Sequence, residues 1–116
     1  MSNPAKERGH RFERAVVEYL RAHGQQVAER AYGEGRSDDQ GDIRGVTVAG
    51  EAVAIQAKDW ARFVASEWLG DAETQRINAR ARFGIAVAKR RGKGAGEAYV
   101  VMTLETFAEM LGRCGA

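Results

Sequence analysis

The stretch Val53-Ala54-Ile55-Gln56-Ala57-Lys58, preceded by Gly41-Asp42-Ile43, decides the fold that we expect for this chain. Side chains alternate between the two faces of a strand, so Gln56 and Lys58 should point the same way while the alternate apolar residues point into a core. Asp42 lies on the strand that precedes them. The pattern therefore predicts a carboxylate, an amide and an amine on neighbouring strands.

A short turn joins these two strands. Residues 42–49 alternate well enough for a strand, with Val46 and Val48 on one face, and Gly50-Glu51 turns the chain into the strand 52–58. Strands joined by so short a turn pair antiparallel. We therefore expect an antiparallel pair here.

Further helical and strand-like segments flank this pair. Asn3-Pro4 is typical of a helix start and Gly24 of a helix end, which predicts a first helix between them. No internal repeat is visible, so we expect one domain over residues 1–116, of class α/β, with a mixed central β-sheet flanked by helices. The remaining expected elements are strands at 26–30, 83–88 and 98–102, a loop at 31–41 and two further helices. The second helix is expected at 66–82, with one stripe formed by Leu69, Ala72, Arg76 and Ala79. The last helix should be capped by Thr103 and end at Gly112, with one face formed by Leu104, Phe107, Ala108 and Leu111.

Composition narrows the class of protein. A chain of 116 residues is long enough to bury about two-thirds of the surface that its unfolded form exposes. The single cysteine, Cys114, favours a free thiol in a reducing compartment. No apolar run approaches the roughly 20 residues needed to span a bilayer, and the N-terminus is charged. We therefore expect a soluble intracellular protein without a membrane partner, cytoplasmic or nucleoid-associated and of cellular or viral origin.

Basic residues are clustered although the net charge is only +2. Affinity for phosphates follows the charge of the face presented, so local patches matter more than the total. We expect one patch on the first helix, one on the second helix and one in the glycine-rich turn 89–96. The residues expected to contact DNA are Arg8, Arg11, Arg14, Arg36, Lys89, Arg90, Arg91 and Lys93.

The polar residues on the paired strands suit phosphodiester hydrolysis. A hard cation polarises phosphate and acidifies water, and Mg²⁺ prefers oxygen ligands and retains several waters. Asp42 would supply a carboxylate, Gln56 a side-chain carbonyl and Ala57 a main-chain carbonyl, with Mn²⁺ as a possible substitute for Mg²⁺. Lys58 would then position or deprotonate the attacking water, or neutralise the developing charge.

Each of these residues also has a structural interpretation. Glu13 follows the core-facing Phe12 and is assigned as an additional metal or water ligand, but it could equally belong to a solvated face with Arg14 and Glu18. Gln56, an amide inside an apolar strand, could be satisfied by a buried hydrogen-bond network without metal.

Two tryptophans offer a different kind of contact. Trp60 and Trp68 could stack on bases, although an aromatic residue beside a helix more often packs in the core.

The chain resembles the PD-(D/E)xK nuclease superfamily through Phe12-Glu13-Arg14, Gly41-Asp42-Ile43 and Ile55-Gln56-Ala57-Lys58. The resemblance implies a restriction-endonuclease-like fold, in which Glu13, Asp42 and Gln56 are metal-site residues, Lys58 is the catalytic lysine and Ser37 contributes to cleavage. The chain departs from the motif at Gly41, where the motif has proline, and at Gln56, where it has an acid.

Within this superfamily, the small size and order of elements look like those of Holliday junction resolvases, and Mrr-like restriction endonuclease domains are similar too. The resemblance implies a metal-dependent DNA endonuclease that cuts four-way junctions as a homodimer. Apolar residues of the last helix, or Val64, Trp68 and Leu69, would supply the two-fold interface, or the same residues would instead close the core. The alternatives are a restriction or repair-type duplex endonuclease and a catalytically inactive DNA-binding module. The small net charge leaves a structural or protein-interaction domain without a DNA partner as the last alternative.

Overall fold

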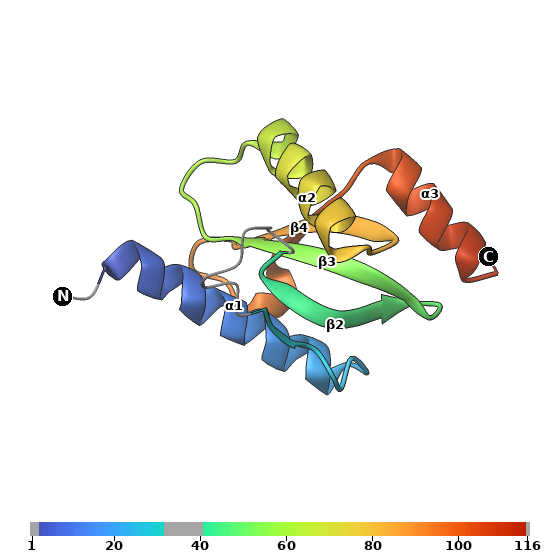
Figure 1. The fold of residues 1–116 in the computed structure, drawn as a ribbon. Helices are drawn as coiled ribbons and strands as arrows, with labels where there is room; N and C mark the ends of the chain where they lie inside the picture. The colour runs from blue at the N-terminus through green and yellow to red at the C-terminus, as the bar shows by residue number, and fades with distance from the viewer. Residues whose placement is uncertain (1–2, 32–40, 116) are drawn as a thin grey trace.

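A five-stranded mixed sheet with the order β1-β2-β3-β4-β5 forms the centre of the part of the chain that the computed structural model describes, residues 3–31 and 41–115. The elements follow the expected order of helix, three strands, helix, two strands and helix within those residues (Figure 1). Their bounds are α1 Pro4–Ala22, β1 Glu29–Arg30, β2 Ile43–Val48, β3 Glu51–Lys58, α2 Ala65–Ala79, β4 Phe83–Ala88, the 3₁₀-helix η1 Ala95–Glu97, β5 Tyr99–Val101 and α3 Leu104–Arg113.

The pairing of the strands confirms the antiparallel hairpin and the mixed sheet. β2 and β3 pair antiparallel, with Ile43 opposite Ile55, and the turn between them passes through Ala49 and Gly50 with φ of 51° and 81°. β3 and β4 pair parallel, from Val53 opposite Phe83 to Lys58 opposite Ala88. A parallel pair needs a crossover, which α2 provides. The carboxyl ends of β3 and β4 therefore lie together at one edge of the sheet.

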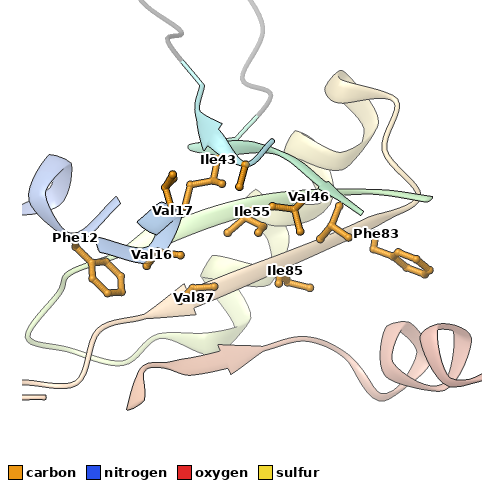
Figure 2. Close-up of a cluster of buried hydrophobic side chains, with 11 residues drawn as sticks. Phe12, Val16, Val17, Ile43, Val46, Ile55, Phe83, Ile85 and Val87 are labelled. Atoms are coloured by element: carbon orange, nitrogen blue, oxygen red, sulfur yellow. The ribbon is translucent and has the colours of Figure 1, made fainter. Parts of the chain in front are cut away.

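The main core fills the space between α1 and one face of the sheet. Figure 2 shows Phe12, Val16 and Val17 of α1 with the strand residues that they face. The alternation predicted for β3 is confirmed, because Val53 and Ile55 belong to this core. The strand residues of this buried cluster are Ile43, Val46, Val53, Ile55, Phe83, Ile85 and Val87.

The second face of the sheet is covered by α2, on the opposite side from α1 (Figure 1). The stripe predicted for α2 is wrong in part: Ala72 is buried, but Trp68 and Gln75 are its buried partners. Trp68, Ala72 and Gln75 are spaced so that they share one helical face, but the polar Gln75 interrupts the apolar pattern by which such a face is predicted. The close approach of α2 to β4 depends on Gly84, where a Cβ atom would lie 2.6 Å from the Ala72 carbonyl oxygen.

The first strand is shorter than predicted because residues 26 and 27 form a turn, in which the Ala28 N–H donates to the Gln25 carbonyl at 3.0 Å. Gln25 accepts from the Thr47 N–H and donates to the Thr47 carbonyl, both at 3.0 Å. Only Glu29 and Arg30 pair as β1, opposite Arg44 and Ile43.

Helix ends follow local hydrogen bonds. The Asn3 side chain accepts from the Ala5 and Lys6 N–H groups, as predicted for an N-cap. Helix α2 ends before the predicted residue because Arg80 adopts a left-handed conformation with φ of 55°. None of the described helices combines the length and apolar character needed to cross a membrane.

Candidate functional site

Asp42 is held against β3 at the start of β2. Its Oδ2 accepts a hydrogen bond from the Ala57 N–H at 2.9 Å, and its own N–H donates to the Ile55 carbonyl at 2.8 Å. Ala57 lies between Gln56 and Lys58 on β3. The structure therefore brings Asp42 to the strand segment where the sequence predicts its partners.

Gly41 explains one departure from the nuclease motif. Its φ is +99°, and a Cβ atom there would lie 3.1 Å from the Ile55 carbonyl oxygen. Proline is confined to φ near about −65°, so it cannot adopt this conformation. Glycine stands before Asp42 because the chain approaches β3 with a backbone conformation that proline excludes.

Gln56 lies at the centre of a buried polar network beneath α2 and is only 5% exposed. With its amide oriented to satisfy its neighbours, its side-chain oxygen accepts from Gln75 Nε2 at 3.1 Å and from Lys58 Nζ at 2.9 Å. Its Nε2 donates to the Trp68 carbonyl at 3.2 Å. The predicted buried network around this amide therefore exists.

Lys58 ends β3 with its amine between an amide and an aromatic ring. Besides the contact with Gln56, Nζ lies 4.6 Å from the centroid of the Trp60 ring. A cation above an aromatic face is attracted by the negative face of the ring. Both contacts hold the amine at the carboxyl end of β3, on the face away from α1.

Glu13 forms an ion pair that ties α1 to β1. Its Oε1 accepts from Arg30 Nε at 3.0 Å, and its side chain is 15% exposed. It does not share the solvated face of Arg14 and Glu18, which are exposed. Because Arg30 pairs with Ile43 in the sheet, this ion pair lies one residue along the strand from Asp42.

The oxygen donors near Asp42 are chemically suited to Mg²⁺ but are already engaged. Mg²⁺ takes oxygen ligands and keeps several waters, so a carboxylate, an amide oxygen and a main-chain carbonyl form an acceptable donor set. Within the described residues, no cluster of three or more His, Cys, Asp or Glu side chains surrounds a metal-sized site. To bind metal, Gln56 would have to exchange a hydrogen bond, and Glu13 would have to leave Arg30.

Basic residues from α1 and the β4–β5 turn meet beside this end of the sheet. Arg8, Arg11, Lys89 and Lys93 line a cavity of about 240 Å³. Arg91 lines a neighbouring cavity of about 420 Å³, together with Arg8 and Lys89. Two other residues predicted to bind DNA are described: Arg14 is exposed on α1, and Arg90 lies over the Tyr99 ring. The predicted DNA-binding residue Arg36 and the predicted catalytic residue Ser37 fall outside the described residues.

Two further arginines, Arg76 on α2 and Arg82 just before β4, lie at the end of the sheet opposite to the basic turn. Arg76 is paired with Glu73 at 2.5 Å, which raises the pKa of Arg76 and lowers that of Glu73. Arg82 is paired with Glu109. Because Phe83 and Ala88 are the two ends of β4, these arginines are separated from the basic turn by about 16 Å of strand.

Two residues near the site have no role in the prediction from sequence. Gln75 is 2% exposed and supports Gln56, a role that a polar residue on an apolar helical stripe could have signalled. Asp59, directly after Lys58, is mostly buried and lies 3.9 Å from Lys89 Nζ.

The tryptophans differ in exposure. Trp68 is 1% exposed and packs in the core beneath α2, so it can neither stack on a base nor contribute to a dimer surface, whereas Trp60 is 50% exposed.

No protein-family model, curated protein or solved structure matches this chain. The functional interpretation therefore rests on the geometry described above and on the motif residues themselves.

Proposed function

We propose that this protein is a metal-dependent DNA endonuclease of the PD-(D/E)xK type that resolves four-way junctions. The observation that carries the proposal is the convergence of Asp42, Gln56 and Lys58 at one end of β3, through the hydrogen bond from Ala57 to Asp42 and the contact between Lys58 and Gln56. The sheet between α1 and α2 would then be a restriction-endonuclease-like fold.

Asp42 and Gln56 would hold Mg²⁺ or Mn²⁺, with the Ala57 carbonyl and Glu13 as further ligands. The metal, when bound, would supply an acidified water and a positive charge opposite the phosphate. The Ala57 N–H orients the Asp42 carboxylate through one oxygen. This hydrogen bond restricts the rotation of the side chain toward the position where a ligand is needed.

Lys58 would act on the attacking water and on the developing negative charge. Its amine is held by Gln56 and lies over Trp60, so it is already positioned at the carboxyl end of the strand. A preorganised cation stabilises a phosphoryl transition state without reorganising at the moment of reaction.

The basic residues of α1 and of the β4–β5 turn would hold the phosphates. The four cations Arg8, Arg11, Lys89 and Lys93 line one cavity at the same end of the sheet as Lys58, and they outnumber Asp59, the single acidic side chain in the described part of its lining. Contacts to phosphates fix the position of DNA without reading its sequence. A DNA substrate would also imply a location in the cytoplasm or nucleoid.

Two symmetric cuts across a four-way junction require two active sites, so we propose a homodimer. The predicted interface on the last helix suits this role, because Leu104, Phe107 and Leu111 on α3 are 79%, 47% and 43% exposed. Sedimentation velocity on the intact protein and on Leu104→Glu tests this surface. We expect a dimer for the intact protein and a monomer for the variant.

A catalytically inactive DNA-binding module is the second candidate. It is favoured by the hydrogen bonds that already occupy the Gln56 oxygen and by the ion pair of Glu13 with Arg30. Such a module would bind DNA through the same basic surface but would not need metal.

Calorimetry with Mg²⁺ and Mn²⁺, with and without DNA, tests the two candidates against each other. The endonuclease predicts that the intact protein binds metal and that Asp42→Ala does not. If the intact protein binds DNA but takes up no metal even in its presence, the inactive module is correct and the endonuclease is wrong.

A further inference from the structure

Three exposed aromatic side chains form a continuous surface that begins at Lys58. Trp60, Phe63 and Tyr99 are 50%, 55% and 51% exposed. Phe63 lies 4.9 Å from the ring of Trp68 and 6.4 Å from that of Tyr99, and Trp60 lies 6.1 Å from Trp68. The buried Trp68 therefore supports exposed rings from the β3–α2 connection and from β5.

These rings line a cavity of about 310 Å³ whose other polar walls are cationic. No acidic side chain lies among the described residues that line it. We call it the aromatic cleft; its rings are those of Trp60, Phe63, Trp68 and Tyr99, and its cations are Lys89, Arg90, Arg91 and Lys93.

A cation lies against the exposed ring near each end of the cleft. Lys58 Nζ is 4.6 Å from the centroid of Trp60, and the Arg90 guanidinium carbon is 4.9 Å from that of Tyr99. Trp60 and Tyr99 are thus each held by a charged neighbour, whereas Phe63 packs against the rings of Trp68 and Tyr99. Contiguous exposed aromatic surface on a soluble domain commonly marks a binding site.

The buried edge of the cleft also contains an unsatisfied donor. Trp68 Nε1 has no hydrogen-bond partner within the described residues, although the side chain is 1% exposed. A buried N–H without an acceptor costs free energy. Because the Nε1 atom is itself buried, a ligand in the cleft does not contact it in this conformation.

We propose that the aromatic cleft binds unpaired nucleotides of a DNA strand, with bases on the exposed rings and phosphates on the surrounding cations. Rings that alternate with lysine and arginine are the combination that single-stranded nucleic acid requires, because every base has a face that can stack. Bases inside a duplex are already stacked, so only unpaired bases can reach these rings.

This inference rests on the proposed function for the identity of the polymer, and it makes the substrate class more specific. Because Lys58 contacts the first ring of the cleft, an unpaired strand in the cleft leads directly to the candidate catalytic lysine. The branched or open part of a DNA substrate would then be what the protein recognises.

Fluorescence anisotropy with labelled oligothymidine, in a chelating buffer without metal, tests the cleft directly. We expect the intact protein to bind it more tightly than a duplex of equal length or an abasic strand with the same phosphates. Trp60→Ala and Tyr99→Ala should each weaken binding roughly five-fold or more, while Trp60→Phe keeps a ring and most of the affinity. Ile77→Ala removes an exposed apolar side chain of α2 that does not line the cleft, so it should leave binding unchanged.

Three results would each overturn the proposal. They are equal affinity for the abasic strand, unchanged binding in both Trp60→Ala and Tyr99→Ala, and equally tight binding of labelled polyglutamate that depends on the same rings. The readout needs neither metal nor cleavage, so its outcome does not depend on whether the protein is catalytically active. Metal-dependent cleavage without preference for unpaired strands would refute the cleft alone, whereas cleft binding without any cleavage would refute the endonuclease alone.

Discussion

The Oδ2 atom of Asp42 accepts a hydrogen bond at 2.9 Å from the backbone N–H of Ala57. This contact joins the start of β2 to the carboxyl end of β3, at the one residue that separates Gln56 from Lys58. A carboxylate that accepts a backbone N–H is held more rigidly than one in solvent. Under the proposed function this contact would have a chemical role as well as a structural one, and different substitutions separate the two.

We predict that Asp42→Asn folds normally but loses metal-dependent cleavage. An asparagine oxygen can still accept from the Ala57 N–H, but the charge that metal requires is gone. Asp42→Ala should lose cleavage as well and should also unfold more easily, by about 1–2 kcal/mol, because the hydrogen bond is lost. Urea denaturation of both variants checks the structural part. Equal destabilisation of the two variants would contradict the role assigned to this hydrogen bond.

Gln56 is predicted to support the fold and to limit metal affinity. Gln56→Leu should lower the free energy of unfolding by about 1–3 kcal/mol, because Gln75, Lys58 and the Trp68 carbonyl each lose their hydrogen bond with Gln56. Gln56→Glu should gain more thermal stability from saturating Mg²⁺ than the intact protein does, since a carboxylate binds the metal more strongly than an amide and binding to the folded state raises its stability. Thermal unfolding with and without Mg²⁺ measures this. An Mg²⁺ response no larger than that of the intact protein would argue against Gln56 as a metal-site residue.

The packing of α2 on β4 is predicted to depend on Gly84. A methyl group there would lie 2.6 Å from the Ala72 backbone carbonyl, so Gly84→Ala should destabilise the protein by about 1–3 kcal/mol. Gly70 is the matched control, because it lies within α2 with no atom near its Cβ position. Gly70→Ala should leave stability unchanged or raise it by up to about 1 kcal/mol. Urea denaturation compares the two, and a Gly84→Ala variant as stable as the intact protein would contradict the close packing.

The salt dependence of DNA binding should distinguish the basic residues that contact phosphates from those that do not. Arg11→Ala and Lys93→Ala remove cations that line one cavity, and each should lower the slope of log affinity against log salt concentration by about 1. Arg82→Ala is the control, because Arg82 is paired with Glu109 near the opposite end of β4. Binding of duplex DNA over a salt series measures the slopes. A change for Arg82 as large as for Lys93 would place the DNA elsewhere.

Much of the fold follows from patterns that are local in sequence. The run of apolar residues at 83–88, the Asn3 and Thr103 caps and the alternation from Val53 to Lys58 all depend on near neighbours, and these predictions are confirmed. The shortened first strand could not be predicted, because the turn at residues 26 and 27 contains neither glycine nor proline to signal it. The buried role of Gln75 depends on Gln56 in another element, and a single polar residue does not reveal its partner.

Part of the candidate site can also be predicted from sequence, because that part depends on residues that are near one another along the chain. The antiparallel strands that carry Asp42 and residues 56–58 follow from a short turn, and this pairing is confirmed; it places the Asp42 carboxylate against the Ala57 backbone. The ion pair of Glu13 with Arg30 and the contact of Lys58 with Trp60 arise only when distant segments pack together. Ser37 and Arg36 fall outside the described residues, so their roles stay predictions.

The most direct test of the central claim is cleavage of a mobile four-way DNA junction with Mg²⁺, beside matched linear duplex and flap substrates. We predict symmetric paired nicks in the junction alone, absent in Lys58→Ala that retains the circular dichroism spectrum of the intact protein. Cutting of linear duplex would instead indicate a restriction or repair-type endonuclease. Tight junction binding with no cleavage in Mg²⁺ or Mn²⁺ would contradict the endonuclease altogether.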